Sequence, residues 1–425
     1  MFRKILGQSE FVRNVLTLFT GTVLAQAIPI LISPVLTRLF SPAEFGLIAL
    51  FTSIVFPLAT LATGRYELAV MLPAKDTDAV NVAGAALLMT LGVSLLLFLP
   101  AYFFNSDICD LLKSPEISSW LYFVPIAVFL TATYQVFSYW LLRKKAFRPS
   151  SVNKISQTTA TSVSGIVLGK ISIVGGLVVA DLFGRIAGVL ISVFQVIKSG
   201  FSFSRMKRAD MKKLAVEHKD FPLYSSGPAF LNKFTLQMPT ILVSMFFGSG
   251  ITGFFNFSRQ ISGNSLLLIS TSISQVFFEK IVSKKNAGEK ILPLLYRLIT
   301  RLSLVAVIYV VGVCLLAPVL FGFIFGSKWS IAGEYAAIMS FGFAIKFVVS
   351  PLSVIFPALD AIKKASWWQI LYFCAIGSLL LFRSFSVINF LITYTAIEVV
   401  VYLLYLFLIL REAGKFDTNL PSTNG

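Results

Sequence analysis

Long runs of apolar residues, separated by short groups of charged residues, glycine or proline, extend over almost the whole chain. A helix that crosses a bilayer needs roughly 20 mostly apolar residues. The pattern therefore predicts an all-α integral membrane protein with about twelve transmembrane helices. We expect them near residues 14–38, 44–63, 79–104, 117–142, 151–169, 172–197, 222–247, 250–279, 294–325, 332–358, 365–383 and 386–410.

The fifth and sixth helices are predicted from length rather than from strong hydrophobicity. About 43 residues separate Lys154 from Lys198, which is enough for two crossings with a turn at Gly169 and Lys170 and too many for one. The first helix opens on a charge-free stretch that is longer than the apolar core of a signal peptide, so we expect it to be retained.

The composition agrees with a chain that is solvated mainly by lipid. Hydrophobic residues make up 56% of the sequence and charged residues 13%, and the mean hydropathy is +0.84, which leaves too little polar surface for a soluble globular domain. His218 is the only histidine, and the three cysteines lie far apart. These counts exclude multi-histidine metal centres and argue against a disulfide framework or a zinc site, so we expect no metal and no cofactor.

The basic residues predict the orientation of the helices. Lys and Arg concentrate in the loops that face the cytoplasm when both termini lie inside, and cytoplasmic loops of membrane proteins are enriched in them. The outward loops then hold only Arg38, Lys113, Lys170, Lys328 and Arg383. The net charge of +17 is therefore mainly a topology signal. A nucleic-acid partner is not expected, because the basic residues are spread over many short loops.

Five tryptophans lie near predicted helix ends, as in the aromatic belts of membrane proteins. They are Trp120, Trp140, Trp329, Trp367 and Trp368. We therefore expect them at the two membrane interfaces.

The longest polar stretch lies near the middle of the chain and joins two sets of six predicted helices. The sequence thus predicts an N-terminal lobe at residues 1–197, a cytoplasmic linker at 198–220 and a C-terminal lobe at 221–425. Six crossings return the chain to the same side, so the lobes are expected to be related by a pseudo-two-fold axis along the membrane normal, as in many transporters.

A faint internal repeat agrees with two related lobes. Residues 39–54 (LFSPAEFGLIALFTSI) and 246–261 (FFGSGITGFFNFSRQI) share three identities, each pair 207 residues apart: Phe40 with Phe247, Gly46 with Gly253, and Ile54 with Ile261. The alternative is a coincidence between two apolar segments.

Six of the charged residues inside predicted membrane helices are singled out here, because a charge there is costly unless it faces a partner or a polar cavity. They are Asp181, Arg185, Lys233, Arg259, Lys346 and Glu398. Asp181 and Arg185 are spaced i, i+4, which favours a mutual salt bridge. Lys346 either pairs with Glu398 or lines a cavity. Asp181 and Glu398 are candidate proton or sodium sites, and a purely structural role for each carboxylate stays open.

Lys233 and Arg259 have no acidic neighbour at helical spacing and occur with polar residues that give the seventh and eighth helices a polar face: Asn232, Gln237, Asn256 and Gln260. Such a face lines water, or else the two long side chains reach toward an interface. A cavity with an excess of cations attracts phosphate or acidic sugars. Arg65, which follows the second helix, is either part of such a site or an interface anchor.

A primary pump and an intramembrane enzyme are not supported. The segment GIVLGKI at residues 165–171 is one residue short between its glycines for a phosphate loop and lacks the Ser or Thr that holds magnesium. The predicted outward loops are too short to carry a separate reaction site. Transport driven by a gradient of H+ or Na+ remains, and we expect that the chain is not an enzyme.

Three regions of the sequence carry a resemblance to a known family. NVLTLFTGTVLAQAIPILISPVLTRLFSPAEFGLIAL with ATGRYELAVMLP, FPLYSSGPAFLNKF with FGSGITGFFNFSRQISGNSLLLISTSISQVFFEK, and FGSKWSIAGEYAAIMSFGFAIKFVVSPLSVIF resemble the Wzx-type polysaccharide and O-antigen flippases of the multidrug/oligosaccharidyl-lipid/polysaccharide (MOP) exporter superfamily. The resemblance covers most of the chain as a diffuse pattern. It departs at SRQISGNSLL, where the family often has a proline and this chain has Gly263 and Asn264, so a different local kink is expected.

This resemblance implies two six-helix lobes around a cationic cavity in a bacterial inner membrane. The implied activity is passage of undecaprenyl-diphosphate-linked oligosaccharide from the cytoplasmic to the periplasmic leaflet by alternating access, next to membrane lipids and with a polysaccharide polymerase and assembly proteins as partners. The expected substrate-binding residues are Arg65, Asn232, Lys233, Gln237, Asn256, Arg259 and Lys346, with Asp181 and Glu398 as ion-coupling residues.

Three alternatives stay open. A small-molecule (MATE-like) exporter is expected to carry acidic cavity residues for cationic drugs, whereas this chain has an excess of cations. A flippase for the peptidoglycan lipid precursor commonly has extra helices that this length does not allow. A membrane scaffold without transport activity would need no buried cations.

Overall fold

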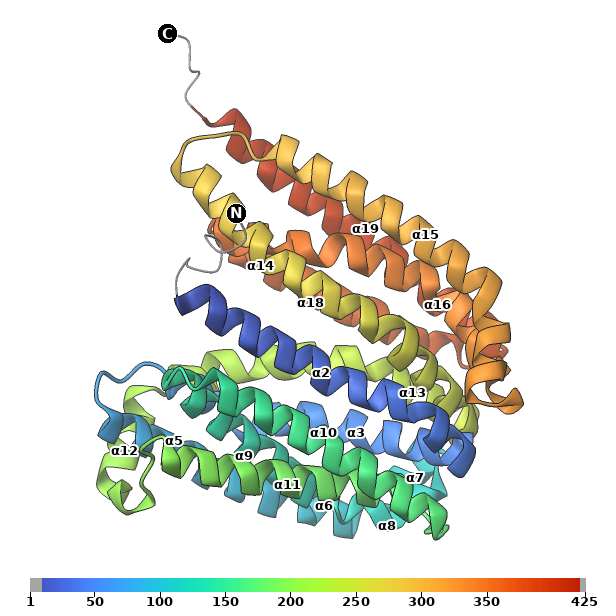
Figure 1. Cartoon of the computed structure of the whole chain (residues 1–425), viewed down its shortest axis with the longest axis horizontal. Coiled ribbons are helices and arrows are strands. Elements are labelled where there is room, and N and C mark those ends of the chain that lie inside the picture. The colour runs from blue at the N-terminus through green and yellow to red at the C-terminus, as the bar shows by residue number, and fades with distance from the viewer. Residues whose placement is uncertain (1–9, 421–425) are drawn as a thin grey trace. The chain divides into compact units, whose positions relative to one another are not determined.

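The computed structural model describes residues 10–420 (Figure 1). Within this range the chain is helical throughout, with α, 3-10 and π segments joined by short turns and without a β-strand. Arg3 and Lys4, which contribute to the predicted orientation of the N-terminus, lie outside the described residues. The chain divides into two compact units, unit 1 (Met1–Gly253) and unit 2 (Phe254–Gly425).

Each predicted membrane crossing is occupied by helix. Unit 1 contains α2 (Glu10–Leu39), α3 (Pro42–Ala62), α4 (Tyr66–Ala69), α5 (Asp76–Leu96), α6 (Phe98–Phe103), α7 (Asn105–Leu112), α8 (Ser118–Leu121), α9 (Val124–Arg143), α10 (Phe147–Lys170), α11 (Gly176–Lys198), α12 (Arg208–Glu217) and most of α13 (Ser226–Ser258). Unit 2 contains the end of α13 and α14 (Asn264–Asn286), α15 (Leu292–Phe325), α16 (Ser330–Val349), α17 (Ile355–Ala358), α18 (Ile362–Gly377) and α19 (Val387–Thr418).

The seventh and eighth predicted helices meet at a backbone break. Gly248 has φ 79° and ψ −179° inside α13, a conformation that only glycine adopts readily. The predicted seventh helix ends at residue 247, directly before this break, and the predicted eighth helix starts at residue 250. The division between the two units also lies inside α13, whereas the lobe boundary expected at residues 198–220 stays a prediction.

Ten helical stretches in the described part of the chain are long and apolar enough to cross a membrane. This number and the twelve predicted crossings differ for two reasons. Residues 221–286 count as one stretch, helical apart from the break at Gly248, and it covers both the seventh and the eighth crossing. The other reason is α10, which is rich in Ser and Thr and is not among the ten.

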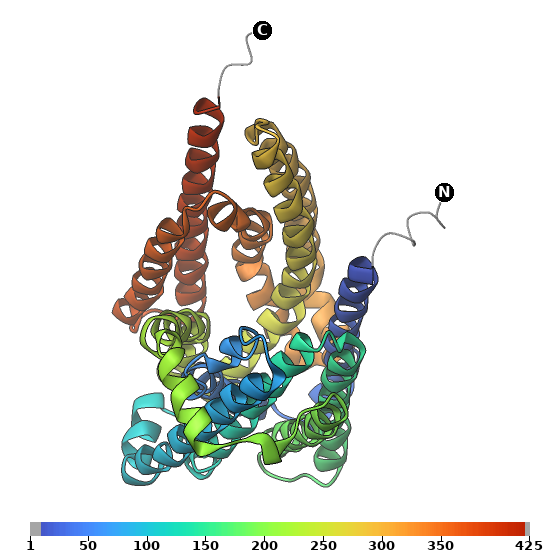
Figure 2. The ribbon, with the colours of Figure 1, turned by 90° about the vertical axis from the view of Figure 1, so that its left-hand side faces the viewer.

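Two polar side chains of α10 hydrogen-bond to its two neighbours. In Figure 1, α10 lies between α2 and α11, and it packs against both. The Asn153 amide donates a hydrogen bond to Ser192 Oγ of α11 at 2.9 Å, and Lys154 Nζ donates to Thr22 Oγ1 of α2 at 3.0 Å. A polar helix is tolerated in a membrane when its polar groups are bonded to protein in this way. In unit 2, α16 packs against both α15 and α19, and Figure 2 shows α19 as the dark red helix that leads to the C-terminus.

The turn between α2 and α3 is fixed by its local sequence. Ser41 caps α3 in a capping box: its backbone N–H donates to the Glu44 carboxylate at 2.8 Å, and the Glu44 N–H donates to Ser41 Oγ. Pro42 occupies the first turn of α3, where its missing N–H costs nothing. These residues start α3 sharply and fix the position of its first turns.

The start of α3 packs very closely against the segment of α13 that forms the second copy of the predicted repeat. A Cβ atom added to Gly46 of α3 would overlap the carbonyl oxygen of Ser249, and one added to Gly253 would overlap the carbonyl oxygen of Pro42. The contact is reciprocal, because Pro42 and Ser249, like Gly46 and Gly253, are 207 residues apart. Glycines allow two helix backbones to approach this closely. The two identical glycines of the repeat therefore lie at one helix crossing within unit 1.

The five tryptophans differ in burial, and their place at the membrane interfaces stays a prediction. Trp140 and Trp329 are fully buried, and Trp368 is nearly so. Trp140 Nε1 donates to Ser199 Oγ at 2.9 Å, and the Trp329 ring packs on Phe257 in the core of unit 2. Trp367 is the one that is largely exposed, with a relative exposure of 72%. Proximity to a helix end does not by itself distinguish an interface residue from a core residue.

Candidate functional site

A buried carboxylate organises the interior of unit 2. Glu398 of α19 is 1% exposed. Its Oε1 accepts hydrogen bonds from Lys346 Nζ of α16, from the Tyr372 hydroxyl of α18 at 3.0 Å and from the Tyr394 hydroxyl of α19 at 2.8 Å. The pair between Lys346 and Glu398, one of the two alternatives for Lys346, is therefore formed. A buried charge needs such compensation, because an unpaired one costs several kcal/mol.

Arg259 joins this group of residues. Its guanidinium lies 5.4 Å from the centre of the Phe255 ring. The Phe255 and Tyr394 rings pack edge to face, with their centres 5.9 Å apart. Arg259 also lies close enough to Lys346 for electrostatic repulsion between the two cations. We call Arg259, Lys346, Tyr372, Tyr394 and Glu398 the Glu398 cluster. Its three charged side chains carry a net charge of +1.

The backbone at Arg259 is not α-helical. Arg259 to Gly263 form a π-helix of five residues between α13 and α14. This is the position where the family resemblance breaks down and a different kink was expected. A π-turn inside a helix is often found at functional sites, and here it begins at the candidate cation.

The other predicted substrate-binding residues of α13 belong to different units. Lys233 and Asn232 are exposed and Gln237 is half-buried, all three on the part of α13 that belongs to unit 1. Asn256 is half-buried at the end of α13 that belongs to unit 2. Unit 2 therefore brings Arg259 and Lys346 together, and the sharing of one cavity by Lys233 and Arg259 stays a prediction.

Asp181 and Arg185 form the predicted i, i+4 pair on α11. Arg185 Nε lies 2.6 Å from Asp181 Oδ2, and a second guanidinium nitrogen lies 3.3 Å from Oδ1. Arg185 is 4% exposed, donates to the Thr131 hydroxyl of α9 and lies over the Phe56 ring of α3. The pair thus connects three helices of unit 1. Both predicted ion-coupling carboxylates, Asp181 and Glu398, are paired with a cation, and their coupling role stays a prediction.

Arg65 is half-buried and has a strained backbone conformation. It adopts a left-handed conformation with φ 61°, and its Nη1 lies 3.2 Å from Glu67 Oε1. Glu67 is 1% exposed, and among the described residues neither Glu67 Oε2 nor Arg65 Nε has a hydrogen-bond partner. Left-handed non-glycine residues are uncommon and gather at functional sites. Arg65 was among the predicted site residues and Glu67 was not, although Glu67 follows Arg65 by only two residues in the segment GRYEL.

Burial raises the pKa of Glu67 above its ordinary value of 4.5, against the smaller opposing effects of Thr63 and Arg65. The folded protein then holds a proton that the unfolded chain has released, so stability falls as the pH rises from about 4.5 through the raised pKa. We expect Glu67→Gln to remove this dependence and to leave Arg65 with an oxygen acceptor. Thermal unfolding of both proteins in detergent between about pH 4 and pH 8 measures the slope, and equal slopes would contradict the assignment.

Comparison with known proteins identifies the family of the chain. The family described as "Polysaccharide biosynthesis protein" matches residues 35–333, which is more than half of the chain. The chain belongs to this family. It is 21% identical over 355 residues to the "Succinoglycan biosynthesis transport protein ExoT" of Rhizobium meliloti (strain 1021), covering 80% of this chain and 67% of that protein. It is 20% identical over 390 residues to an "Uncharacterized membrane protein in cps region" of Klebsiella pneumoniae, covering 85% of this chain and 76% of that protein.

Solved structures confirm the fold. An inward-facing multidrug resistance MATE family transporter of the MOP superfamily matches with a TM-score of 0.72 and 12% identity over 93% of this chain and 96% of that chain. The lipid II flippase MurJ in an inward closed conformation matches with a TM-score of 0.72 and 15% identity over 95% of this chain and 90% of that chain. The family resemblance and the prediction of an all-α multi-pass membrane protein are confirmed. The family and its relatives place the chain among transporters rather than enzymes.

Proposed function

We propose that this polysaccharide biosynthesis family member is a flippase for undecaprenyl-diphosphate-linked oligosaccharide repeat units of an O-antigen, a capsule or an exopolysaccharide. It moves them from the cytoplasmic to the periplasmic leaflet of a bacterial inner membrane by alternating access, with both termini in the cytoplasm. The observation that carries the proposal is the Glu398 cluster, in which Arg259 lies within electrostatic range of the Lys346–Glu398 pair of unit 2.

The chemistry of the cluster suits a diphosphate. The planar guanidinium of Arg259 binds two phosphate oxygens at once, and the Lys346 ammonium acts as a point charge. The net charge of +1 attracts an anion, whereas Glu398 limits the attraction so that the lipid can also leave. Asn256, which is half-buried on the same part of α13, supplies an amide for sugar hydroxyls.

Glu398 is the proposed ion-coupling residue of this cluster. Protonation of Glu398 changes the sum of its three charged side chains from +1 to +2 and releases Lys346 from its counter-ion. Loss of that proton restores the pair and weakens the hold on an anion. A proton gradient can thus alternate the cluster between a state that binds phosphate tightly and a state that releases it. Asp181 is the corresponding candidate in unit 1, where Arg185 is its partner.

The substrate class is favoured by the sequence relatives. The family and both relatives described above are named for polysaccharide biosynthesis or for a cps region. The similarity to MATE and MurJ structures at 12% and 15% identity concerns the fold and favours neither a small-molecule exporter nor a peptidoglycan precursor flippase. A polysaccharide polymerase and assembly proteins are the proposed partners, because a translocated repeat unit must be polymerised on the periplasmic side.

Translocation of a fluorescent undecaprenyl-diphosphate oligosaccharide in proteoliposomes tests the proposal. We expect Arg259→Ala to slow the movement by about tenfold or more, since a hydrogen bond to a charged group contributes about 1.5–3 kcal/mol. Lys233→Ala tests the cation of unit 1 in the same assay. The matched control is Arg383→Ala, which removes an exposed arginine from a predicted outward loop.

The outcomes separate the site from the function. Slow transport by Arg259→Ala with intact folding and normal transport by the control supports the Glu398 cluster as part of the pathway. Normal transport by both Arg259→Ala and Lys233→Ala rejects the proposed site. No movement by the native protein rejects this substrate and favours the small-molecule exporter.

A further inference from the structure

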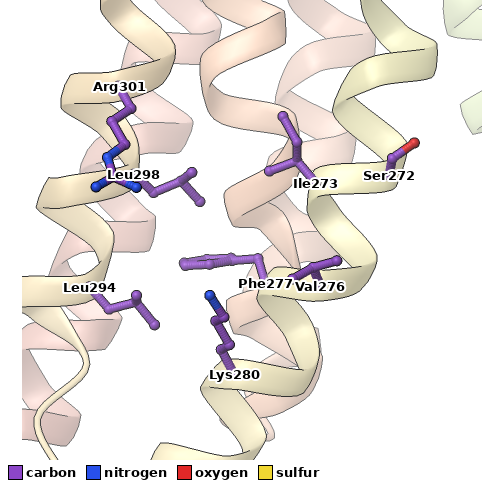
Figure 3. A pocket seen from close by; sticks show the side chains of 8 residues that line it. All are labelled: Ser272, Ile273, Val276, Phe277, Lys280, Leu294, Leu298 and Arg301. Atoms are coloured by element: carbon purple, nitrogen blue, oxygen red, sulfur yellow. The ribbon is translucent and has the colours of Figure 1, made fainter. Parts of the chain in front are cut away.

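A groove between α14 and α15 combines an apolar wall with two basic side chains. It has a volume of about 380 Å³ and lies within unit 2. Its wall includes Ile273, Val276, Phe277 and Leu298, and Lys280 and Arg301 complete it. Figure 3 shows the Lys280 ammonium and the Arg301 guanidinium directed from the two helices toward the same space, with the Phe277 ring between them. We call this feature the α14–α15 groove.

The two cations of the groove are not compensated. Among the described residues neither Lys280 nor Arg301 has an ion pair or a side-chain hydrogen bond. Two lysines further along α14 differ, since Lys284 lies 2.5 Å from Glu289 and Lys285 lies 2.7 Å from Asp360. Glu279 precedes Lys280, but adjacent residues of a helix do not face each other. The groove therefore presents two positive charges at its apolar wall without an anion.

The two charges lie at similar distances from the loop that connects α14 and α15. Lys280 lies six residues before the end of α14 at Asn286, and Arg301 lies nine residues after the start of α15 at Leu292. At about 1.5 Å per residue, both lie roughly 9–14 Å from the same connecting loop. In the proposed topology this loop is cytoplasmic, and anionic lipids are concentrated in the cytoplasmic leaflet.

We propose that the α14–α15 groove binds an anionic phospholipid of the cytoplasmic leaflet. The phosphate lies between Lys280 and Arg301, and an acyl chain lies along Ile273, Val276 and Leu298. Basic pockets between membrane helices on the cytoplasmic side bind acidic headgroups in this way. Ser272 is the one uncharged polar residue of the lining, so the groove has few groups that could bind sugars. A small phosphate headgroup therefore fits better than a lipid-linked oligosaccharide.

The bound lipid would join α14 to α15 near their connecting loop. The π-turn at Arg259 lies at the opposite end of α14. The lipid site is separate from the Glu398 cluster and goes beyond the proposed function. Only the assignment to the cytoplasmic leaflet rests on the topology of that function. Binding of a lipid to the folded state also stabilises it, by mass action.

Native mass spectrometry of the full chain in detergent tests the proposal. The probes are phosphatidylglycerol, phosphatidylcholine and undecaprenyl phosphate. We expect the native protein to bind phosphatidylglycerol more tightly than phosphatidylcholine. The double variant Lys280→Gln with Arg301→Gln is expected to weaken phosphatidylglycerol binding by about tenfold or more, because each basic residue near a membrane surface contributes about a factor of five.

A matched control removes the same charge from the same end of the helices. Lys290→Gln with Arg297→Gln changes two exposed basic residues that do not line the groove, and we expect binding within about twofold of native. Arg301→Lys keeps the charge and is expected to retain most of the binding. Circular dichroism and size-exclusion chromatography show whether each variant is folded, and a variant that fails is replaced by the corresponding single substitution.

Three results would overturn the proposal. Equal weakening by the groove variant and the control variant would show a general effect of surface charge. Equal binding of phosphatidylglycerol and phosphatidylcholine by the native protein would remove the role of the cations. Displacement of phosphatidylglycerol by a much lower concentration of undecaprenyl phosphate would assign the groove to the prenyl carrier. Flippase activity is not the readout in any of these arms, so a failure of the proposed function does not affect the result.

Discussion

Glu398→Ala is expected to lower the free energy of unfolding by about 3–5 kcal/mol, the range for removal of one partner of a buried ion pair. The substitution leaves Lys346 with an uncompensated charge in the interior of unit 2 and removes the acceptor of the Tyr372 and Tyr394 hydroxyls. Thermal unfolding in detergent, with the yield of monodisperse protein as a second readout, measures the effect. A Glu398→Ala protein as stable as native would contradict the buried network.

A double variant distinguishes a structural from a functional role of the pair. Lys346→Met with Glu398→Gln removes both charges, keeps an oxygen acceptor for the two tyrosines and fills the space of the lysine. Replacement of a buried pair by uncharged residues of similar volume is often neutral for stability, so we expect most of the lost stability to return. Under the proposed function, transport stays impaired, because one cation and the carboxylate proposed for ion coupling are gone. Normal transport by this folded variant would make the pair purely structural.

The helices were predictable because the bilayer sets a local requirement. Each crossing needs about 20 residues whose backbone and side chains lipid tolerates, and this can be judged from one segment at a time. The helix α10 shows how far this reasoning extends. Its composition alone would have excluded it, but the number of residues between Lys154 and Lys198 required a second crossing, and the structure supplies the missing polar partners from α2 and α11.

Helical spacing predicts side-chain contacts within one helix more readily than contacts between helices. The Asp181–Arg185 pair follows from its i, i+4 positions and forms as expected. The same spacing relates Tyr394 to Glu398, and their hydrogen bond could have been predicted. Tyr372 lies on another helix, and no local pattern associates it with Glu398. Such a residue is brought to the carboxylate by packing of whole helices, which sequence spacing does not describe.

The internal repeat had a weak sequence signal but makes a specific structural contact. Three identities between two apolar segments do not exclude coincidence. The crossing at Gly46 and Gly253 adds a geometric reason for one of them, because each glycine faces the backbone carbonyl of the other segment. A side chain at either position would push two helix backbones apart, and no rotamer change relieves a clash between Cβ and a backbone atom.

Gly253→Ala is therefore expected to lower the stability of unit 1 by about 3 kcal/mol or more, at the upper end of the cost of overpacking. Gly250→Ala is the matched control, because it lies on the same helix and an added Cβ meets nothing within 4 Å. Alanine has a higher helix propensity than glycine, so the control is expected to gain about 0.5–1 kcal/mol. Thermal unfolding in detergent distinguishes the two opposite signs. Equal stability of the Gly250→Ala and Gly253→Ala proteins would mean that the helices do not cross this closely.

The reciprocal contact also predicts the effects of Gly46→Ala and of the double variant. Gly46→Ala is expected to cost about as much as Gly253→Ala, since each Cβ meets a carbonyl oxygen of the facing helix. The double variant should lose less stability than the two single losses added together, because the first Cβ already separates the backbones and makes room for the second. Strict additivity would instead indicate two independent contacts, and the interpretation of Gly46 and Gly253 as one crossing formed by a repeated segment would then be wrong.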